Sequence, residues 1–263
     1  MANYLRDRAF ILSLKASRER DAWVSLWTEH HGRQEAFVTG IRTATSKQRA
    51  HLQPFSCVQI MLAEGKQFQR VAVAQMTATH GHAIRMHPVW SATMGAICQL
   101  CETISAPQDP QEDARIFSLL LECTQLAEAF PQPFSPERAL FFQAFFLERF
   151  ARLFGYGVSF RQCVRCQSQP ISCSGFLTQE GGFLCASCEQ AQLPSRTPVF
   201  SSDQDTLRKL LLFLEQGSLA DALRLSAPKS VFRDLALLYE ALLTVLPVKR
   251  SPLQTAFLHS FYR

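Results

Sequence analysis

The segment CVQIMLAEGKQFQRVAVAQM, residues 57–76, contains two short apolar runs that are separated by a turn at Gly65. Both runs have the length and the β-branched content of strands, and the second alternates along part of its length. Three similar runs precede them, so that we expect strands at 9–14, 22–28, 35–41, 57–63 and 68–76. Five strands in about 80 residues suit a small closed barrel. We expect an OB-fold, with an SH3-like barrel as the alternative of similar strand count.

The pattern becomes helical from about Pro88. Apolar positions predict helices at 89–105, 113–130, 136–154, 205–216, 219–226 and 230–246. The third is the clearest, because Ser135 can cap it, Pro136 suits its first turn and Gly155 can end it. We expect its phenylalanine-rich face in the core, although a partner groove is the alternative.

The predicted fold class is therefore an α+β multidomain protein. A barrel at 1–80 precedes a helical domain in two parts, 81–160 and 196–263, which an insertion at 161–195 interrupts. The segment 194–198, with a proline at each end, is the best linker candidate after the insertion.

Composition and charge limit the function classes. The chain has 263 residues, 47% of them hydrophobic, enough for a sizeable core. The apolar run before Lys15 is too short for a signal peptide and no later run resembles a membrane span, so we expect a cytoplasmic protein without a membrane partner. All of the net charge of +5 lies in residues 1–80, with 11 Lys and Arg against 6 Asp and Glu. This excess suits nucleic-acid binding, and also an ordinary solvated surface.

Five of the nine cysteines lie within CVRCQSQPISCSGFLTQEGGFLCASC, residues 163–188. Two C-x2-C pairs with 18 residues between them match the spacing of zinc sites: Cys163 with Cys166, and Cys185 with Cys188. Four thiolates satisfy tetrahedral zinc and leave no position for water. We therefore expect structural Zn²⁺ that does no chemistry. Cys173, between the pairs, could replace one of these ligands, but it lacks a C-x2-C partner and is interpreted as a free thiol.

The other cysteines are expected in the core. Cys98 and Cys101 form a further C-x2-C pair, but they lie in a helical pattern, where they share a face and behave as small hydrophobic residues. A redox pair would need a strand–helix setting and a lowered thiol pKa. Cys57 and Cys123 are interpreted in the same way.

Catalytic patterns are missing from the sequence. It contains no G-x-G-x-x-G, no phosphate-binding G-x-x-x-x-G-K-[ST] and no G-x-S-x-G, so nucleotide hydrolysis and acyl transfer lack their usual residues. The pairs His30–His31 and His80–His82 are expected in surface turns, although either could bind a metal adventitiously. We expect a protein that is not an enzyme and has no small-molecule substrate.

Two segments carry a resemblance to a known family. HHGRQEAFVTGIRTATSKQRAHLQPFSCVQIML, residues 30–62, contains a glycine–arginine turn, a basic loop and the sequence LQPF. ERFARLFGYGVSFRQCVRC, residues 148–166, contains FGYGV shortly before the first cysteine pair. Both are similar to segments of the bacterial RecO family of recombination mediators, and the resemblance covers nearly the whole chain in order.

The resemblance implies an OB-fold followed by a helical domain with a zinc-finger-like insertion, and a function in DNA repair without catalysis. It implies binding to single- and double-stranded DNA, annealing of complementary strands, and contact with the acidic C-terminal tail of the single-stranded DNA-binding protein. It also implies action with RecR in loading RecA onto coated DNA, in the cytoplasm at the nucleoid. The implied DNA-binding residues are Arg33, Arg42, Lys47 and Arg49.

Further residues are candidates within this interpretation. Trp23, Trp27 and Phe37 could stack on bases if they face outward from the barrel. The partner tail is expected at helices that carry Arg115, Arg138, Arg149 and Arg152. Two alternatives remain open: a zinc-containing OB-fold module for RNA binding or transcription, and a metal-dependent hydrolase or redox enzyme, for which an open metal site is missing.

Overall fold

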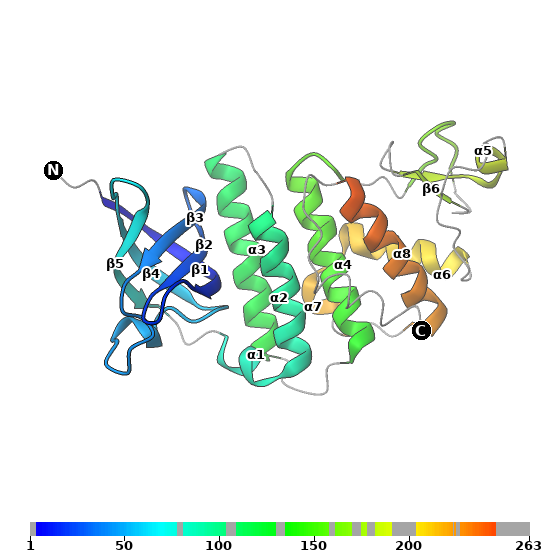
Figure 1. Cartoon of the computed structure of the whole chain (residues 1–263). Coiled ribbons are helices and arrows are strands. Elements are labelled where there is room, and N and C mark those ends of the chain that lie inside the picture. The colour runs from blue at the N-terminus through cyan, green and yellow to red at the C-terminus, as the bar shows by residue number, and fades with distance from the viewer. Residues whose placement is uncertain are drawn as a thin grey trace. The chain divides into compact units, whose positions relative to one another are not determined.

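Five strands close into an N-terminal barrel (Figure 1). The computed structural model describes residues 4–77, 81–103, 109–129, 135–157, 161–169, 175–177, 182–190, 204–222, 224 and 227–245. The strands are β1 (Tyr4–Ala16), β2 (Ala22–Thr28), β3 (Gly32–Val38), β4 (Cys57–Ala63) and β5 (Gln69–Met76). Their order is β1-β2-β3-β5-β4, in which β3 and β5 are parallel and the other pairs antiparallel. This is the OB-fold arrangement, so the predicted fold is confirmed.

Strand β1 closes the barrel because it has two partners. Its first half pairs with β4, from Tyr4 opposite Ala63 to Phe10 opposite Cys57, and its second half pairs with β2. The register shifts between Ile11 and Ser13, and an irregularity of this kind bends a strand. The strand is longer than the predicted 9–14, because its polar ends are held by pairing rather than by apolar burial.

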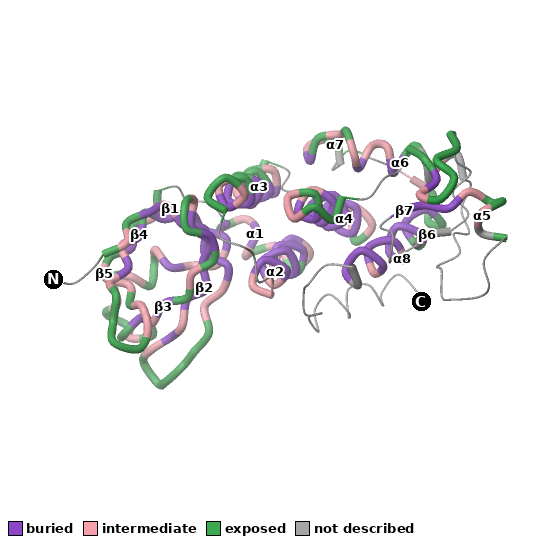
Figure 2. The backbone as a smooth tube through the Cα atoms, turned by 90° about the horizontal axis from the view of Figure 1, so that it is seen from above, coloured by how far each residue is buried: buried purple, intermediate pink, exposed green. Residues whose placement is uncertain are grey.

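The barrel core follows the alternation of the strands. One face of each strand supplies fully or almost fully buried side chains, including Ile11, Val24, Ala36, Ile60 and Ala74. Purple stretches along the backbone tube of the barrel mark its buried residues (Figure 2). The third strand ends at Val38 rather than at the predicted residue 41. Gly40 has a positive φ of 67°, and its N–H donates to Asp21 Oδ1 at 2.8 Å, so the chain turns there.

Contacts divide the chain into two compact units, residues 1–133 and 134–263, which are described separately. The first unit adds α1 (His82–Met86), α2 (Pro88–Thr103) and α3 (Pro110–Ala129) to the barrel. Helix α3 begins as its sequence requires: Asp109 Oδ1 accepts from the N–H of Gln111, and Pro110 occupies the first turn. The predicted domain limits of 1–80, 81–160, 161–195 and 196–263 stay predictions.

Helices α2 and α3 cover the outer face of β1, β2 and β3 at one end. Trp27 points out of the barrel yet is completely buried, and its indole N–H donates to the carbonyl of Asp113 at 3.1 Å. The Arg8 guanidinium lies 5.1 Å from the centre of the Phe117 ring. Lys15 Nζ lies 3.0 Å from Glu102 Oε2 near the end of α2. The barrel and its first helices therefore share one packed interface.

Gly32 allows the close approach of α3 to the barrel. Its φ is +59°, and a Cβ at this position would lie 2.6 Å from Asp113 Oδ1. A side chain would therefore be strained by the backbone and would also clash. The packing of α3 against the barrel thus explains why the glycine–arginine turn has glycine at position 32.

The second unit is built around α4 (Pro136–Leu153), which Figure 2 shows as mostly buried. Its ends follow the prediction: Ser135 Oγ accepts from the N–H of Arg138 at 3.3 Å, and Gly155 has a φ of +75°. The N–H of Tyr156 reaches the carbonyl of Ala151 at 2.9 Å, and that of Gly155 reaches the carbonyl of Arg152, as in a Schellman motif.

The remaining elements of this unit are short strands and further helices. They are β6 (Gly175–Leu177), β7 (Gly182–Leu184), α5 (Ala186–Gln190), α6 (Gln204–Gln216), α7 (Leu219–Ala222) and α8 (Lys229–Val245). Helix α4 packs against α6, α7 and α8. Phe141 and Phe145 lie with ring centres 5.9 and 6.5 Å from that of Phe213, so the phenylalanine-rich face is core. The linker candidate 194–198 lies outside the described residues. No helix in the described ranges is long and apolar enough to cross a membrane.

Asp113 should make stability depend on pH. Burial raises its pKa from 3.8 to about 6, with neighbouring Asp109 and Glu112 adding to the effect, and its Oδ2 has no hydrogen-bond partner among the residues that the structure describes. Because the folded state holds the proton more tightly, the free energy of unfolding should fall as pH rises from about 4 to 7. Asp113→Asn should therefore be more stable than the wild type at pH 8 by about 2 kcal/mol and lose this advantage near pH 4.

Urea unfolding at several pH values measures this difference. Glu122→Gln is the matched control, because it neutralises an exposed carboxylate on the same helix that does not contribute to the pKa of Asp113. If Asp113→Asn and the wild type keep a constant difference in the free energy of unfolding from pH 4 to 8, the raised pKa is wrong.

Candidate nucleic-acid interface and metal centre

Arg42 lies beside the turn between β1 and β2. Its backbone N–H donates to the carbonyl of Arg20 at 3.0 Å, and its Nη1 donates to the carbonyl of Arg18 at 3.1 Å. All three arginines are exposed. The structure therefore joins the loop after β3 to a second basic segment, SRER at 17–20, which the sequence analysis did not select although its charge density was visible.

Lys47 and Arg49 lie at a short 3₁₀ helix, η1 (Gln48–Ala50), farther along the same loop. Gln48 Nε2 donates to the carbonyl of Ala72, which attaches this part of the loop to β5. Both basic side chains are exposed. Within the described residues, no carboxylate lies within ion-pair distance of either one. Their charges therefore face solvent.

Arg33 occupies a different environment from the loop residues. It is the second residue of β3, and its Nη1 donates to the carbonyl of Glu102 at 2.7 Å, in the last turn of α2. A cation at this position satisfies a carbonyl that the helix leaves unpaired and interacts favourably with the helix dipole. Arg33 is exposed, but it also holds α2 against the barrel.

The aromatic candidates separate into two groups. Trp27 is completely buried under α3, so of its two interpretations, base stacking and core packing, the structure supports core packing. Trp23 and Phe37 face outward and are half-buried. The two lie opposite each other on β2 and β3, with ring centres 5.3 Å apart. Phe68 completes the cluster, at 5.1 Å from Trp23.

The histidine pair after β2 is tied to a buried carboxylate. The Nδ1 atoms of His30 and His31 lie 2.9 and 3.0 Å from the two oxygens of Asp7. Although burial raises the pKa of Asp7, hydrogen bonds from His30, His31 and Arg8 lower it overall. The hydrogen bond to Asp7 raises the pKa of His30. The side chains of Asp7, Glu29 and His30 lie close enough together to hold one metal ion. The hydrogen bonds between the two histidines and Asp7 already explain the histidine pair, because they fix the turn after β2.

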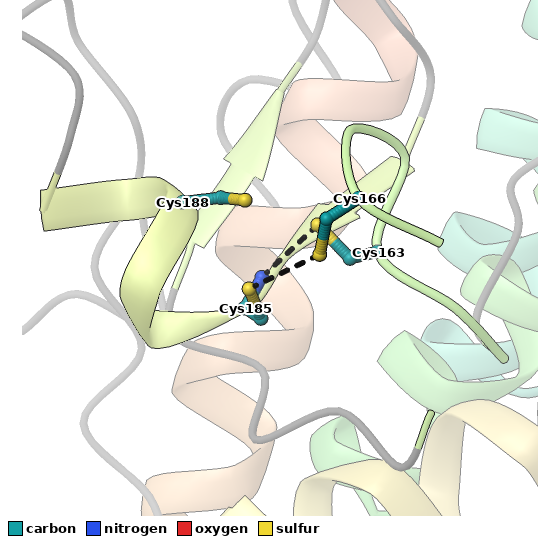
Figure 3. Close-up of side chains that lie close together, drawn as sticks. All are labelled: Cys163, Cys166, Cys185 and Cys188. Carbon is teal, nitrogen blue, oxygen red and sulfur yellow. Dashed lines mark hydrogen bonds between the residues drawn. The ribbon is translucent and has the colours of Figure 1, made fainter. Parts of the chain in front are cut away.

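The four predicted cysteine ligands come together in the second unit (Figure 3). Cys163 and Cys166 lie in a turn before β6, Cys185 follows β7, and Cys188 lies on α5. Their sulfur atoms all lie within 4.8 Å of one another. The distance of 3.7 Å between Cys166 Sγ and Cys185 Sγ is close to the spacing of about 3.8 Å that tetrahedral ligands 2.3 Å from zinc would have.

Backbone hydrogen bonds shape the first cysteine turn. The N–H of Gln167 donates to the carbonyl of Cys163 at 2.9 Å, and the N–H of Val164 donates to the carbonyl of Phe183 on β7 at 3.0 Å. The N–H of Cys185 points to Cys163 Sγ at 3.5 Å. The turn is thus attached to the strand that precedes the second pair.

The electrostatics of the cluster favour a cation. A hydrogen bond with the Ser168 side chain lowers the pKa of Cys166 to about 6, whereas hydrogen bonds with Cys185 and Cys166 raise the pKa of Cys188 to about 12. Neighbouring thiols share protons in this way because several thiolates together repel one another. The four cysteines can hold a metal ion, whose charge would remove that repulsion. Cys173 lies outside the described residues.

The other cysteines are core residues, as predicted. Cys98, Cys101 and Cys123 are buried, and burial raises the pKa of each thiol well above its usual range. Cys57 is buried as well. Low reactivity follows, because the thiolate is the reactive form.

The arginines considered for the partner tail have different surroundings. Arg149 donates to the carbonyl of Gly217, and its guanidinium lies 4.7 Å from the centre of the Phe145 ring. Arg152 pairs with the buried Glu148, whose pKa burial raises, and lies 3.9 Å from Glu215. Both therefore take part in the packing of the second unit. Arg115, on α3 in the first unit, is exposed, and Arg138 at the start of α4 is half-buried.

Comparison with known proteins connects these features to one family. The family model "Recombination protein O N terminal" matches residues 1–80, and "Recombination protein O C terminal" matches residues 91–246. A DNA repair protein RecO of Bifidobacterium animalis subsp. lactis is 29% identical over 219 residues, which are 82% of this chain and 84% of the relative.

Further relatives have the same printed name. The DNA repair protein RecO of Dehalococcoides mccartyi is 25% identical over 239 residues, or 90% of this chain and 88% of the relative. That of Nocardioides sp. is 27% identical over 197 residues, or 73% and 78%. Because the two family models together match most of the chain, and an OB-fold barrel and a helical region follow each other in the same order, the chain belongs to the RecO family of DNA repair proteins.

Proposed function

We propose that this chain is a non-catalytic recombination mediator that binds single- and double-stranded DNA and anneals complementary strands. With RecR, it promotes the loading of RecA onto DNA that is coated by the single-stranded DNA-binding protein, in the cytoplasm at the nucleoid. The observation that carries the proposal is that both RecO family models match this one chain. The barrel segment, residues 1–80, has all of the excess positive charge.

The proposed task requires contact with DNA of any sequence. Lys and Arg side chains provide such contact, because neutralised phosphates release counterions whatever the bases are. The exposed Arg42, Lys47 and Arg49 suit this role, and the adjoining Arg18 and Arg20 extend it. Arg33 is a weaker candidate, because it also binds the end of α2.

The proposed protein partner is the acidic C-terminal tail of the single-stranded DNA-binding protein. Recognition of carboxylates favours arginines that are not already committed to internal ion pairs. Arg149 and Arg152 have such internal partners, which supports Arg115 and Arg138 as the better candidates. RecR is the proposed second partner.

We further propose that Cys163, Cys166, Cys185 and Cys188 bind one structural Zn²⁺. The donor set fits, since four thiols within 4.8 Å of one another match the number and chemistry of ligands in closed zinc sites. The metal would link the turn before β6 to the residues around α5. It would supply no catalysis, because a closed site has no position for water.

The first test is the mediator activity itself. Together with RecR, this protein should shorten the delay that single-stranded DNA-binding protein imposes on RecA filament assembly, because it would open gaps in the coat. The readout is RecA ATP hydrolysis on coated single strands. Coat protein that lacks its acidic tail is the control, and the stimulation should then be much smaller. No effect on RecA with the intact coat protein would contradict the proposed function.

A salt series tests the phosphate contacts. The triple variant Arg42→Ala, Lys47→Ala, Arg49→Ala should lower the slope of log affinity against log salt by about 2, since each lost contact to a single strand accounts for about 0.7. Its thermal stability should change little, because substitutions at exposed loop positions rarely exceed about 0.5 kcal/mol. Arg115→Ala, an exposed arginine on α3, is the control. An unchanged slope in a folded triple variant would show that DNA binds elsewhere.

Metal analysis tests the zinc proposal. The wild type should contain about one zinc per chain, and Cys185→Ser should lose it and become sensitive to protease at residues 161–190, since small metal sites fold together with their metal. The control Ser187→Ala changes an exposed residue of the same segment and should retain both properties. Full zinc content in Cys185→Ser would disprove the ligand assignment.

A further inference from the structure

A row of side chains crosses three strands on the outside of the barrel. Trp23 on β2 is opposite Phe37 on β3, and Phe37 is in turn opposite Arg70 on β5. The neighbours of these residues, including Val24 and Ala36, point into the core, so the row must point outward. Phe68 directly precedes β5 and joins the row from the side.

The three rings form one cluster with a cation beside it. The ring centres of Trp23, Phe37 and Phe68 lie 5.1 to 5.4 Å apart, in edge-to-face and tilted arrangements. The Arg70 guanidinium lies 5.4 Å from the centre of the Phe68 ring. Tilted rings do not use their flat faces fully on one another, so ring surface remains for a further flat group.

The aromatic cluster is the solvent-exposed part of the outer face of β2, and α3 covers the other aromatic residue of that face. Trp27 lies on the same face of β2, four residues beyond Trp23, but α3 buries it completely. Trp23, Phe37 and Phe68 are only half-buried. A cavity of about 410 Å³ lies beside Phe68, which lines it together with residues 63–67 and Arg70.

The surroundings select a negatively charged, flat occupant. Lys66 and Arg70 are exposed and line the cavity beside Phe68 together with the exposed Glu64, so two cations face one carboxylate there. Trp23 lies three residues after Arg20, whose carbonyl binds Arg42 of the neighbouring loop. Aromatic rings flanked by cations hold single-stranded nucleic acid in a sequence-tolerant way, because every base has a flat face and every linkage has a phosphate. The bases of a duplex already stack on one another and are not available.

We propose that Trp23, Phe37, Phe68 and Arg70 form a subsite for the unpaired bases of single-stranded DNA, in which the rings stack on bases and Arg70 contacts a phosphate. The proposal rests on the proposed DNA-binding function and adds the discrimination between single strands and duplex. Phosphate contacts in the basic loops serve both forms of DNA, whereas this subsite serves only the single strand.

Intrinsic fluorescence tests the subsite in the wild-type chain without any substitution. Of the three tryptophans, Trp27 and Trp90 are buried, with exposed fractions of 0% and 1%, so only Trp23 can respond directly to a bound base. Oligothymidylate should quench the emission. A phosphodiester chain of the same length without bases, and a duplex of the same length, should bind through their phosphates and leave the emission unchanged.

Substitutions provide the second measurement. Phe37→Ala should weaken binding of the single strand about five- to a hundredfold, the range that loss of one stacked base gives, and leave duplex binding unchanged. Trp23→Phe should abolish the quenching but keep the single-strand affinity within about twofold, since the ring is retained. The control Tyr156→Ala removes an exposed aromatic of the second unit, outside the barrel, and should change neither quantity.

The outcomes separate this inference from the function on which it rests. If single-stranded DNA binds tightly without quenching Trp23, the subsite is wrong and the DNA-binding function stands. Equal quenching by the chain without bases also overturns the subsite, because the rings would then respond to the backbone alone. Quenching by an acidic peptide with an aromatic end, and not by oligothymidylate, would assign the cluster to a protein partner instead. If no DNA binds at all, both proposals fail.

Discussion

The packing of α3 against the outer face of the barrel decides which part of that face remains open. Trp27 fills the contact, its indole N–H binds the carbonyl of Asp113, and Gly32 leaves the space that this approach requires. A barrel of five strands buries little apolar surface in its interior, and the helices bury more by packing against its outer face. Because they cover one end of β2 and β3, the aromatic residues at the other end stay half-exposed.

This asymmetry gives the proposed DNA-binding surface two physical components. The basic loops, joined through the hydrogen bonds between Arg42 and the turn at Arg18 and Arg20, carry charge that attracts any phosphate chain. The aromatic row offers flat apolar surface, which only an unstacked base can use. A mediator that must act on gaps of any sequence needs the first component for affinity, and the second would direct it to the single strand.

Local patterns predicted much of this structure. Short apolar runs between turns predicted the positions of all five strands. Ser135, Pro136 and Gly155 predicted the ends of α4, because caps depend only on neighbours in sequence. The cysteine spacing likewise predicted a cluster that the fold brings together, since each C-x2-C turn is local.

Contacts between distant segments could not be predicted in this way. The burial of Trp27 depends on a helix that begins more than 80 residues later, and Arg33 meets α2 for the same reason. Phe68 and Arg70 join Phe37 only through the parallel pairing of β3 with β5, which no alternation pattern reveals.

The proposed metal would have a structural task in the segment that contains the cysteine cluster. Its two strands have three residues each, and the buried side chains among its described residues are few: Cys163, Phe183 and Leu184. So small a core supplies little hydrophobic stabilisation. In addition, Gln167 has a φ of 57°, a left-handed conformation that costs energy for a residue other than glycine and persists only where its surroundings enforce it. The hydrogen bond from Gln167 to Cys163 provides part of that constraint, and a metal that fixes the sulfurs on both sides of the turn would provide the rest.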